Sequence, residues 1–413
     1  MSIPDKDRTV LRDLAKELAA IAALPVQAER AELWRRMNGM DPVRPMVWCN
    51  VAASCWSEFF NGDELQCTDE WARRHELSMR QGLYHSEHFK DDQVFDGTIA
   101  SPIAIHDTGW GITEDSTPPE HWDGARRYNT IIAADADPEI IGMPRITVDW
   151  EATERNYERL CDVYDGILTV EKRGRDGFWF SIMDEFIKWR GIETVMVDMV
   201  DRPEWVHAVM ERMTDGWLSR LDQLESQGLL SLNNGNQRVG SAAFGYTDEL
   251  PQAGFDGEHV RTIDMWGHAT TQIFSEVSPA MHDEFALTYE KRFLERFGLS
   301  NYGCCEPLHL KVDIAKTIPN LRRLSMSPWI DAEVGAEAIG RHCIFSWKPN
   351  PAILGGEDWF PELARDHIRD TLEKTKDCVV EIIMKDLHTC RGEPDRIAEW
   401  CEIASELAEE YAA

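Results

Sequence analysis

Thiols follow two short apolar runs of the sequence. Cys304 and Cys305 follow the run 297–301, and Cys390 follows the run 379–384 at a distance of six residues. A short run of this kind predicts a buried strand, so the thiols are expected close to the carboxyl ends of two strands. In parallel α/β folds, ligands and catalytic groups collect at that end of the sheet.

A carboxylate and an imidazole accompany these thiols. Glu306 follows the first pair and His388 precedes the last cysteine. Thiolate, imidazole and carboxylate are ligand types that zinc selects in proteins, so we expect a zinc ion held by Cys304, Cys305 and Cys390. Glu306 and His388 are the expected catalytic residues, or they complete the ligand set.

The two adjacent cysteines can bind one ion only if the chain turns at that point. Successive side chains of a strand point to opposite faces, so without a turn one thiol is a ligand and the other is buried. The alternative is that both thiols pack beneath a loop and that the histidine caps a carbonyl. The spacing does not match a zinc finger. The other seven cysteines are expected to be packing residues.

Three further residues are candidate substrate contacts. His268 and Trp266 lie in one short segment, and Lys348 follows a predicted strand at 343–347. The lysine can bind a carboxylate or a phosphate, and the histidine is a further candidate ligand. The alternatives are that His268 is a structural histidine with its hydrogen bonds made within the protein, and that Lys348 is a surface lysine. In a barrel, the strand ends at residues 301, 347 and 384 would be neighbours on one rim.

Helix and strand patterns alternate along most of the chain. An amino-terminal helical segment, 5–38, is broken at Pro25 and precedes a short strand at 46–48 and a helical stretch at 55–90. The later helices are predicted at 150–164, 181–190, 203–227, 281–297, 313–319, 332–340, 361–375 and 394–411. The later strands are predicted at 167–171, 194–198, 228–232, 297–301, 323–326, 343–347 and 379–384.

This alternation predicts an α/β fold, a (β/α)8 TIM barrel with an N-terminal helical extension. We expect residues 1–45 to form the extension and residues 46–413 the barrel domain. A loop insertion at 107–145, rich in Gly, Pro and Trp, is expected to be a lid over the carboxyl rim. A doubly wound open sheet is the second choice, although no Gly-x-Gly-x-x-Gly motif follows a first strand.

Composition excludes several classes of function. The chain has 413 residues and a formal net charge of -31, which argues against a nucleic-acid partner. No apolar stretch approaches the ~20 residues that a membrane crossing needs. The first eight residues are polar and charged and do not predict a signal peptide. We therefore expect a cytoplasmic protein with reduced thiols.

Three passages carry a resemblance to a known family. Residues 200–207, residues 278–291 and the two thiol segments resemble the uroporphyrinogen decarboxylase superfamily, in its zinc- and corrinoid-dependent methyltransferase branch. The resemblance covers roughly residues 145 to 410. Those methyltransferases present His-x-Cys at one strand end and a single Cys near the last strand. Cys305 and Cys390 take the two cysteine positions, and Gly303 stands where the histidine is expected, or Tyr302 does if Cys304 is the ligand instead.

That departure leaves the third zinc ligand open. The local replacements are Cys304, Glu306, His309 and His388. Uroporphyrinogen decarboxylases themselves carry an arginine-rich N-terminal signature, and residues 41–48 match only its beginning. The resemblance therefore favours the methyltransferase branch over the decarboxylases.

The resemblance implies a zinc-dependent methyltransferase that moves a methyl group between a small molecule and a corrinoid. The small molecule is a methyl ether, an amine or a thiol, and the direction of transfer is open. The implied partners are this small molecule, a corrinoid protein and, in a homodimer, a second copy of the chain. The alternatives are a decarboxylase or other lyase acting on a small carboxylate, and a corrinoid- or metal-binding protein without turnover.

Overall fold

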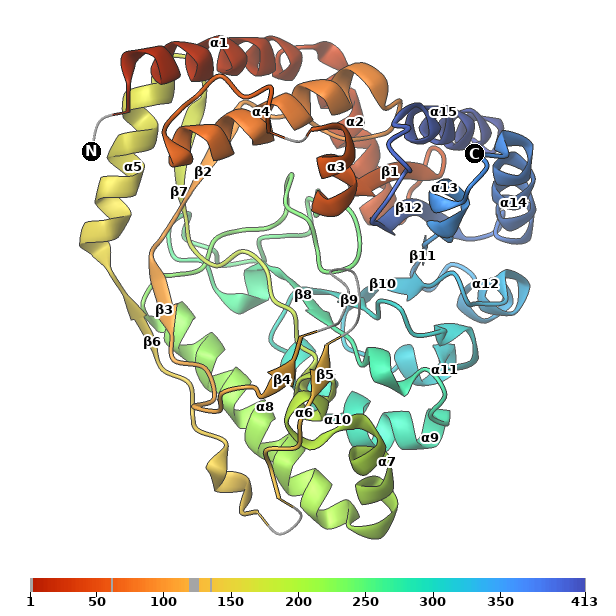
Figure 1. Cartoon of the computed structure of the whole chain (residues 1–413). Coiled ribbons are helices and arrows are strands. Elements are labelled where there is room, and N and C mark those ends of the chain that lie inside the picture. Colours follow the sequence, from red (N-terminus) through yellow and green to blue (C-terminus); the bar gives the residue numbers. More distant parts are fainter. Residues whose placement is uncertain (1–2, 61, 119–125, 134–135, 413) are drawn as a thin grey trace.

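A six-stranded parallel sheet forms the centre of the computed structural model, which describes residues 3–60, 62–118, 126–133 and 136–412. The sheet curls into a half barrel with the strand order β1-β12-β11-β10-β9-β8 (Figure 1). Its strands are β1 (Met46–Val51), β8 (Trp266–Ala269), β9 (Leu299–Tyr302), β10 (Leu321–Met326), β11 (Ile344–Trp347) and β12 (Val379–Leu387).

Three two-stranded ladders lie outside this sheet. They join β2 (Thr98–Pro102) to β7 (Thr169–Arg173), β3 (Ile105–Asp107) to β6 (Ile146–Val148), and β4 (Ser116–Thr117) to β5 (Arg127–Tyr128). A parallel bridge from Phe180 to Ala269 extends the half barrel beyond β8. Within the described ranges, no ladder closes the ring between β1 and β2. The α/β class and the parallel sheet are confirmed, and closure into eight strands stays a prediction.

Fifteen α-helices lie in the described part of the chain. They are α1 (Asp5–Ala22), α2 (Pro25–Asn38), α3 (Ala53–Phe59), α4 (Glu70–His88), α5 (Trp150–Tyr164), α6 (Ile182–Arg190), α7 (Ile192–Asp201), α8 (Pro203–Ser226), α9 (Pro279–His282), α10 (Thr288–Leu294), α11 (Val312–Ala315), α12 (Ala332–Ile339), α13 (Ala352–Gly355), α14 (Pro361–Lys374) and α15 (Asp395–Glu410). A π-helical turn, η4 (Asp283–Leu287), joins α9 to α10, and short 3-10 turns are η1 (Pro138–Ile140), η2 (Thr262–Asp264), η3 (Gln272–Phe274) and η5 (Leu308–Leu310).

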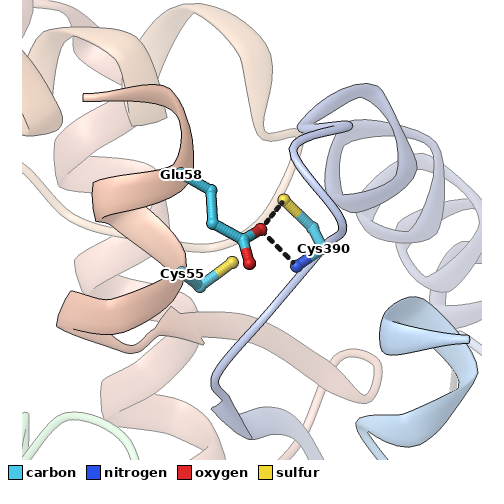
Figure 2. A group of neighbouring side chains, drawn as sticks. All are labelled: Cys55, Glu58 and Cys390. Carbon is cyan, nitrogen blue, oxygen red and sulfur yellow. Dashed lines mark hydrogen bonds between the residues drawn. The ribbon is translucent and has the colours of Figure 1, made fainter. Parts of the chain in front are cut away.

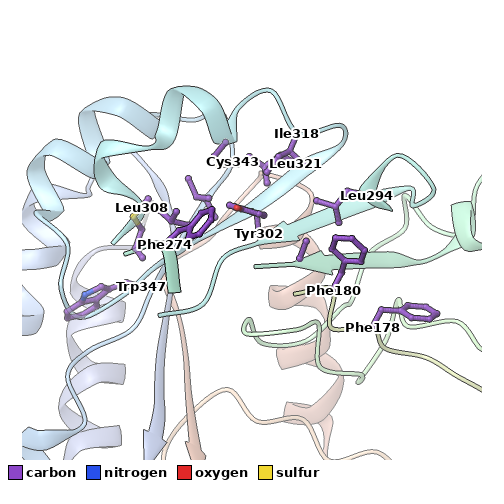
Figure 3. Packing of buried hydrophobic residues seen from close by; sticks show 14 of the residues in the cluster. Phe178, Phe180, Phe274, Leu294, Tyr302, Leu308, Ile318, Leu321, Cys343 and Trp347 are labelled. Atoms are coloured by element: carbon purple, nitrogen blue, oxygen red, sulfur yellow. The ribbon is translucent and has the colours of Figure 1, made fainter. Parts of the chain in front are cut away.

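The two faces of the sheet differ in chemistry. Leu324 and Met326 of β10 belong to the large apolar core beneath the helices, part of which Figure 3 shows. The alternate residues of β10, Arg323 and Ser325, are also fully buried but polar. Because alternate side chains of a strand point to opposite faces, one face of the sheet packs against helices and the other carries polar groups.

The amino-terminal helices pack against the rest of the chain. The break at Pro25 between α1 and α2 is confirmed. Arg8 of α1 forms an ion pair with Asp162 of α5 at 2.5 Å. Asn38, the last residue of α2, accepts hydrogen bonds from the buried guanidinium of Arg323. The first contact attaches α1 to α5, and the second attaches α2 to the central sheet. The domain boundary at residue 45 stays a prediction.

The predicted strand at 194–198 is wrong, because this run lies in α7. Only one side of α7 is buried, with Val195 and Met199 four residues apart, while Val197 and Val200 are exposed. That spacing suits a helix packed on one face. The predicted strand at 228–232 is reduced to one parallel bridge between Arg175 and Leu230.

The last part of the insertion at 107–145 lies along α8. Trp205 donates from Nε1 to the carbonyl of Ala136 at 2.8 Å, and Gln223 donates from Nε2 to the carbonyl of Pro144 at 3.0 Å. Residues 119–125 and 134–135 lie outside the described residues, so the lid stays a prediction. Across the ranges that the structure describes, no helix is both long enough and apolar enough to cross a membrane.

Candidate active site

Cys390 lies beside two residues of α3, Cys55 and Glu58 (Figure 2). Strands β1 and β12 are parallel neighbours, so α3, which follows β1, and Cys390, which follows β12, meet at the carboxyl edge of the sheet. Cys55 and Glu58 are three residues apart and therefore lie on one face of the helix. One ligand atom from each of the three residues lies within 4.8 Å of the others.

Hydrogen bonds hold the Glu58 carboxylate in this group. Its Oε2 accepts from the backbone N–H of Cys390 at 2.9 Å and of Gly392 at 3.0 Å, and it lies 3.4 Å from Cys390 Sγ. Burial acts to raise the pKa of Glu58, but hydrogen bonds from Thr389, Gly392 and Cys390 outweigh it and lower the pKa. The carboxylate is therefore held in its charged form.

The two thiols of the group ionise unequally. The hydrogen bond with Cys55 lowers the pKa of Cys390, whereas the hydrogen bond with Cys390 and burial raise the pKa of Cys55. Cys55 and Cys390 are buried, whereas Glu58 is exposed. Two sulfurs and one carboxylate oxygen fit zinc and leave a fourth position for a substrate. The group can therefore hold a catalytic type of zinc ion.

Cys304 and Cys305 form a second thiol site with Lys385. Gly303 has φ 87°, a left-handed conformation that turns the chain after β9. The turn brings the two sulfurs within 3.5 Å of each other, so the condition for a shared ligand is met. Lys385, in β12, places Nζ 3.0 Å from Cys304 Sγ and 3.8 Å from Cys305 Sγ.

The Cys304 thiol is the more acidic of this pair. Its hydrogen bond with Cys305, aided by the Lys385 ammonium, lowers the pKa of Cys304 to about 7 despite burial. The same hydrogen bond and burial raise the pKa of Cys305. The Lys385 ammonium in turn has its pKa raised, because the charges of Cys304, Cys305 and Asp386 outweigh burial.

The pair after β9 fits a divalent metal poorly. Two sulfurs on one tetrahedral zinc, each about 2.3 Å from the ion, lie about 3.8 Å apart, so the sulfur separation alone is suitable. Among the described residues, however, no third His, Cys, Asp or Glu ligand completes a group with these two thiols. The nearest charged group is the Lys385 ammonium, which repels a cation.

The predicted catalytic residues lie apart from each other. Glu306 is fully buried and accepts hydrogen bonds from Thr270 Oγ1 and from the backbone N–H of Cys304, both at 2.9 Å. It therefore fixes the turn that carries the thiols. His388 is exposed, and its Nδ1 lies 3.2 Å from Ser54 Oγ. The catalytic roles of both residues stay predictions.

The predicted substrate contacts are all buried. Burial lowers the pKa of His268 to about 3, and its Nε2 has no hydrogen-bond partner among the described residues. Burial also lowers the pKa of Lys348 to about 7, and Nζ donates to the carbonyl of Ser346 at 2.8 Å. The Trp266 indole donates to the carbonyl of Gly245 at 2.9 Å. Contact of these residues with a substrate stays a prediction.

Cys55 and Glu58 were not identified by the sequence reasoning, which treated Cys55 as a packing residue. The available signal is a Cys-x-x-Glu spacing in the first turns after a predicted strand. The prediction that Cys304, Cys305 and Cys390 share one ion is untested. The structure places the first two with Lys385 and the third with Cys55 and Glu58.

Comparison with known proteins supports the fold. No protein-family model matches the sequence. No curated protein is detectably similar to it in sequence. A solved structure of a methyltransferase from Methanosarcina mazei is similar in fold, with a TM-score of 0.52 and 9% sequence identity. The similarity covers 91% of this chain and 98% of that chain. The two proteins therefore share an overall fold along nearly their whole lengths.

Proposed function

We propose that this protein is a methyltransferase that binds one zinc ion through Cys55, Glu58 and Cys390. The observation that carries the proposal is the convergence of two thiols and a carboxylate at the carboxyl edge of β1 and β12. In parallel α/β folds, catalytic groups collect at that edge. The fold shared with a methyltransferase supports methyl transfer as the reaction class.

The surroundings of this group suit a reaction at its fourth ligand position. Zinc bound there would lower the pKa of a coordinated thiol, or polarise an ether oxygen as a Lewis acid. Backbone N–H groups of Cys390 and Gly392 orient the Glu58 carboxylate. The two buried thiols line the side of the site that faces the protein, and the exposed Glu58 leaves the other side open to solvent. A methyl ether, amine or thiol can approach from that side.

A corrinoid is the proposed methyl carrier. Zinc has no redox chemistry and activates a thiol or an oxygen without itself accepting a methyl group. The sequence contains no Asp-x-His-x-x-Gly motif for binding a corrinoid, so we propose that the corrinoid belongs to a separate partner protein. The net charge of -31 would steer a partner with a basic surface, with an association rate that falls as salt rises.

Methyl transfer to reduced cobalamin is the direct test. Incubation of the zinc-loaded protein with cob(I)alamin and a panel of O-, N- and S-methyl compounds is expected to produce methylcobalamin with one class of donor. In the reverse direction, thiols are expected to demethylate methylcobalamin. The corrinoid absorption spectrum follows both reactions. Absence of transfer with every donor and every thiol would contradict the proposal.

Zinc content separates the two thiol sites. We expect about one zinc per chain in the wild type, and loss of the ion in Cys55→Ser and Cys390→Ser, because two ligands cannot hold it as tightly as three. Cys305→Ser is the matched control and is expected to retain zinc. Elemental analysis of the purified proteins decides the matter. Zinc retained in Cys390→Ser and lost in Cys305→Ser would move the metal to the site after β9.

A lyase acting on a small carboxylate is the second candidate. The charge of the Cys304 thiolate acts on Arg238, Lys348 and Lys385, so three basic side chains lie near the thiols that follow β9. Such a group suits a carboxylate substrate. Release of carbon dioxide from a small acid by zinc-depleted protein, without methyl transfer, would favour this candidate.

A further inference from the structure

The vicinal thiols after β9 have no role in the proposed methyl transfer, yet they are built as a unit. We propose that Cys304 and Cys305 form a binding site for a trivalent organoarsenical, with one arsenic atom bridging both sulfurs. This binding activity is separate from the zinc group at Cys55, Glu58 and Cys390.

The first support is the rigidity of the turn. Cys304 is held at both backbone groups, because its N–H donates to Glu306 Oε2 at 2.9 Å and its carbonyl accepts from Ser325 Oγ at 2.9 Å. The carbonyl of Gly303 accepts from Ser241 Oγ at 2.5 Å. These bonds fix the backbone of the turn, Lys385 Nζ donates to Cys304 Sγ, and the two sulfurs lie 3.5 Å apart without a ligand. A preorganised pair binds a bridging atom without first losing conformational freedom.

The second support is the number and charge of the neighbouring groups. Zinc needs four ligands, and the third neighbour of this pair is an ammonium, Lys385, at 3.0 Å from Cys304 Sγ. Trivalent arsenic forms three bonds, and an organoarsenical brings one of them as its own carbon substituent. Two protein sulfurs therefore complete its valence. The product is neutral, so the Lys385 ammonium does not repel it as it repels a divalent cation.

The third support is access from one side. Cys305 is partly exposed, whereas Cys304 is 4% exposed. The ligand therefore meets Cys305 first and Cys304 second. In each step one As–S bond forms and one As–O bond breaks, and the thiol proton leaves with the hydroxide as water. An arsonous acid, R–As(OH)₂, thus binds both thiols with release of two waters, and arsenic keeps its oxidation state.

Phenylarsine oxide is the probe for this site. We expect intact-protein mass spectrometry to show an adduct on the wild type in which Cys304 and Cys305 together resist alkylation by iodoacetamide. A dithiol should reverse it and a monothiol should not. Cys304→Ser and Cys305→Ser are each expected to weaken binding at this site on the order of 100-fold or more, because the second bond is intramolecular. Wild-type affinity at this site in either variant would overturn the proposal.

The zinc group supplies the matched control. Cys55 and Cys390 are also neighbouring thiols, so the double variant Cys55→Ser/Cys390→Ser removes the competing pair. This variant is expected to retain the adduct at Cys304 and Cys305. Loss of all arsenical binding in it would overturn the proposal, as would peptide mapping that finds Cys304 and Cys305 both alkylated in the treated wild type. The mapping needs no variant, so misfolding of a substituted protein does not affect it.

Discussion

Glu290→Gln is expected to reduce the pH dependence of the protein's stability between about pH 5 and about pH 8. Glu290 is completely buried in α10, where burial and the charges of Glu306 and Asp184 raise its pKa to about 8. Hydrogen bonds from Tyr302 at 2.7 Å and Thr271 at 2.8 Å oppose this shift without overcoming it. The folded protein therefore keeps a proton that the unfolded chain releases.

The sign of the effect follows from this difference in bound protons. Between the ordinary value of 4.5 and about 8, the folded state binds more protons than the unfolded state, so the free energy of unfolding falls as pH rises. At about 1.4 kcal/mol per pKa unit, the rise of the pKa from 4.5 to about 8 lowers the free energy of unfolding by on the order of 5 kcal/mol across this interval. The glutamine variant has no proton to lose at this position and is expected to gain stability relative to the wild type as pH rises.

Urea denaturation of both proteins at intervals from about pH 5 to about pH 8 measures this difference. Glu284→Gln is the control, because Glu284 lies in η4 of the same helical segment but is exposed. It is expected to follow the wild-type curve. Parallel curves for the wild type and Glu290→Gln would show that Glu290 is already ionised in the folded protein.

The sequence predicts the two strands that precede the thiols, β9 and β12, because a short apolar run is a local signal. Val379–Leu387 is buried at almost every position, as expected for a strand covered on both faces, and its apolar run predicts it directly. The wrong strand prediction at 194–198 also rests on a short local run of residues. A short run with several β-branched residues fits a strand or one side of a helix, and in the structure it forms helix α7, which buries Val195, Asp198 and Met199 on one side.

The sequence predicts only some of the residues that form the two thiol sites. Cys304 and Cys305 are adjacent in sequence, so their pairing needs only the turn at Gly303. The group of Cys55, Glu58 and Cys390 depends instead on the pairing of the first strand with the last, which joins residues more than 300 positions apart. Lys385 has no predicted role, because the alternation of side chains along β12 does not say which neighbour its ammonium contacts.

Arg323→Met is expected to destabilise the protein by about 3–5 kcal/mol, because it removes a fully buried charge that several groups depend on. The guanidinium donates to Asn38 Oδ1, the end of α2, and to the carbonyls of Ala243 at 3.3 Å and Phe244 at 2.5 Å. Its Nε also lies 4.0 Å from Oε2 of the buried Glu381. Methionine has a similar length but cannot donate, so Asn38 Oδ1 loses its donor. The Glu381 carboxylate keeps a hydrogen bond from Ser346 Oγ but loses the neighbouring positive charge.

A double variant distinguishes the two sources of that loss. If the loss of the positive charge beside the buried Glu381 carboxylate dominates, Arg323→Met/Glu381→Leu recovers much of the stability, because replacing both partners of a buried pair by apolar groups is often close to neutral. If the lost bonds to Asn38 and the 243–244 carbonyls dominate, the double variant stays as unstable as the single one. Arg369→Met, which removes an exposed ion pair with Glu410, is the control and is expected to change the free energy of unfolding by only about 0.2–1 kcal/mol. An effect of Arg323→Met no larger than this control would mean that α2 and the polar face of the sheet are held together by other contacts.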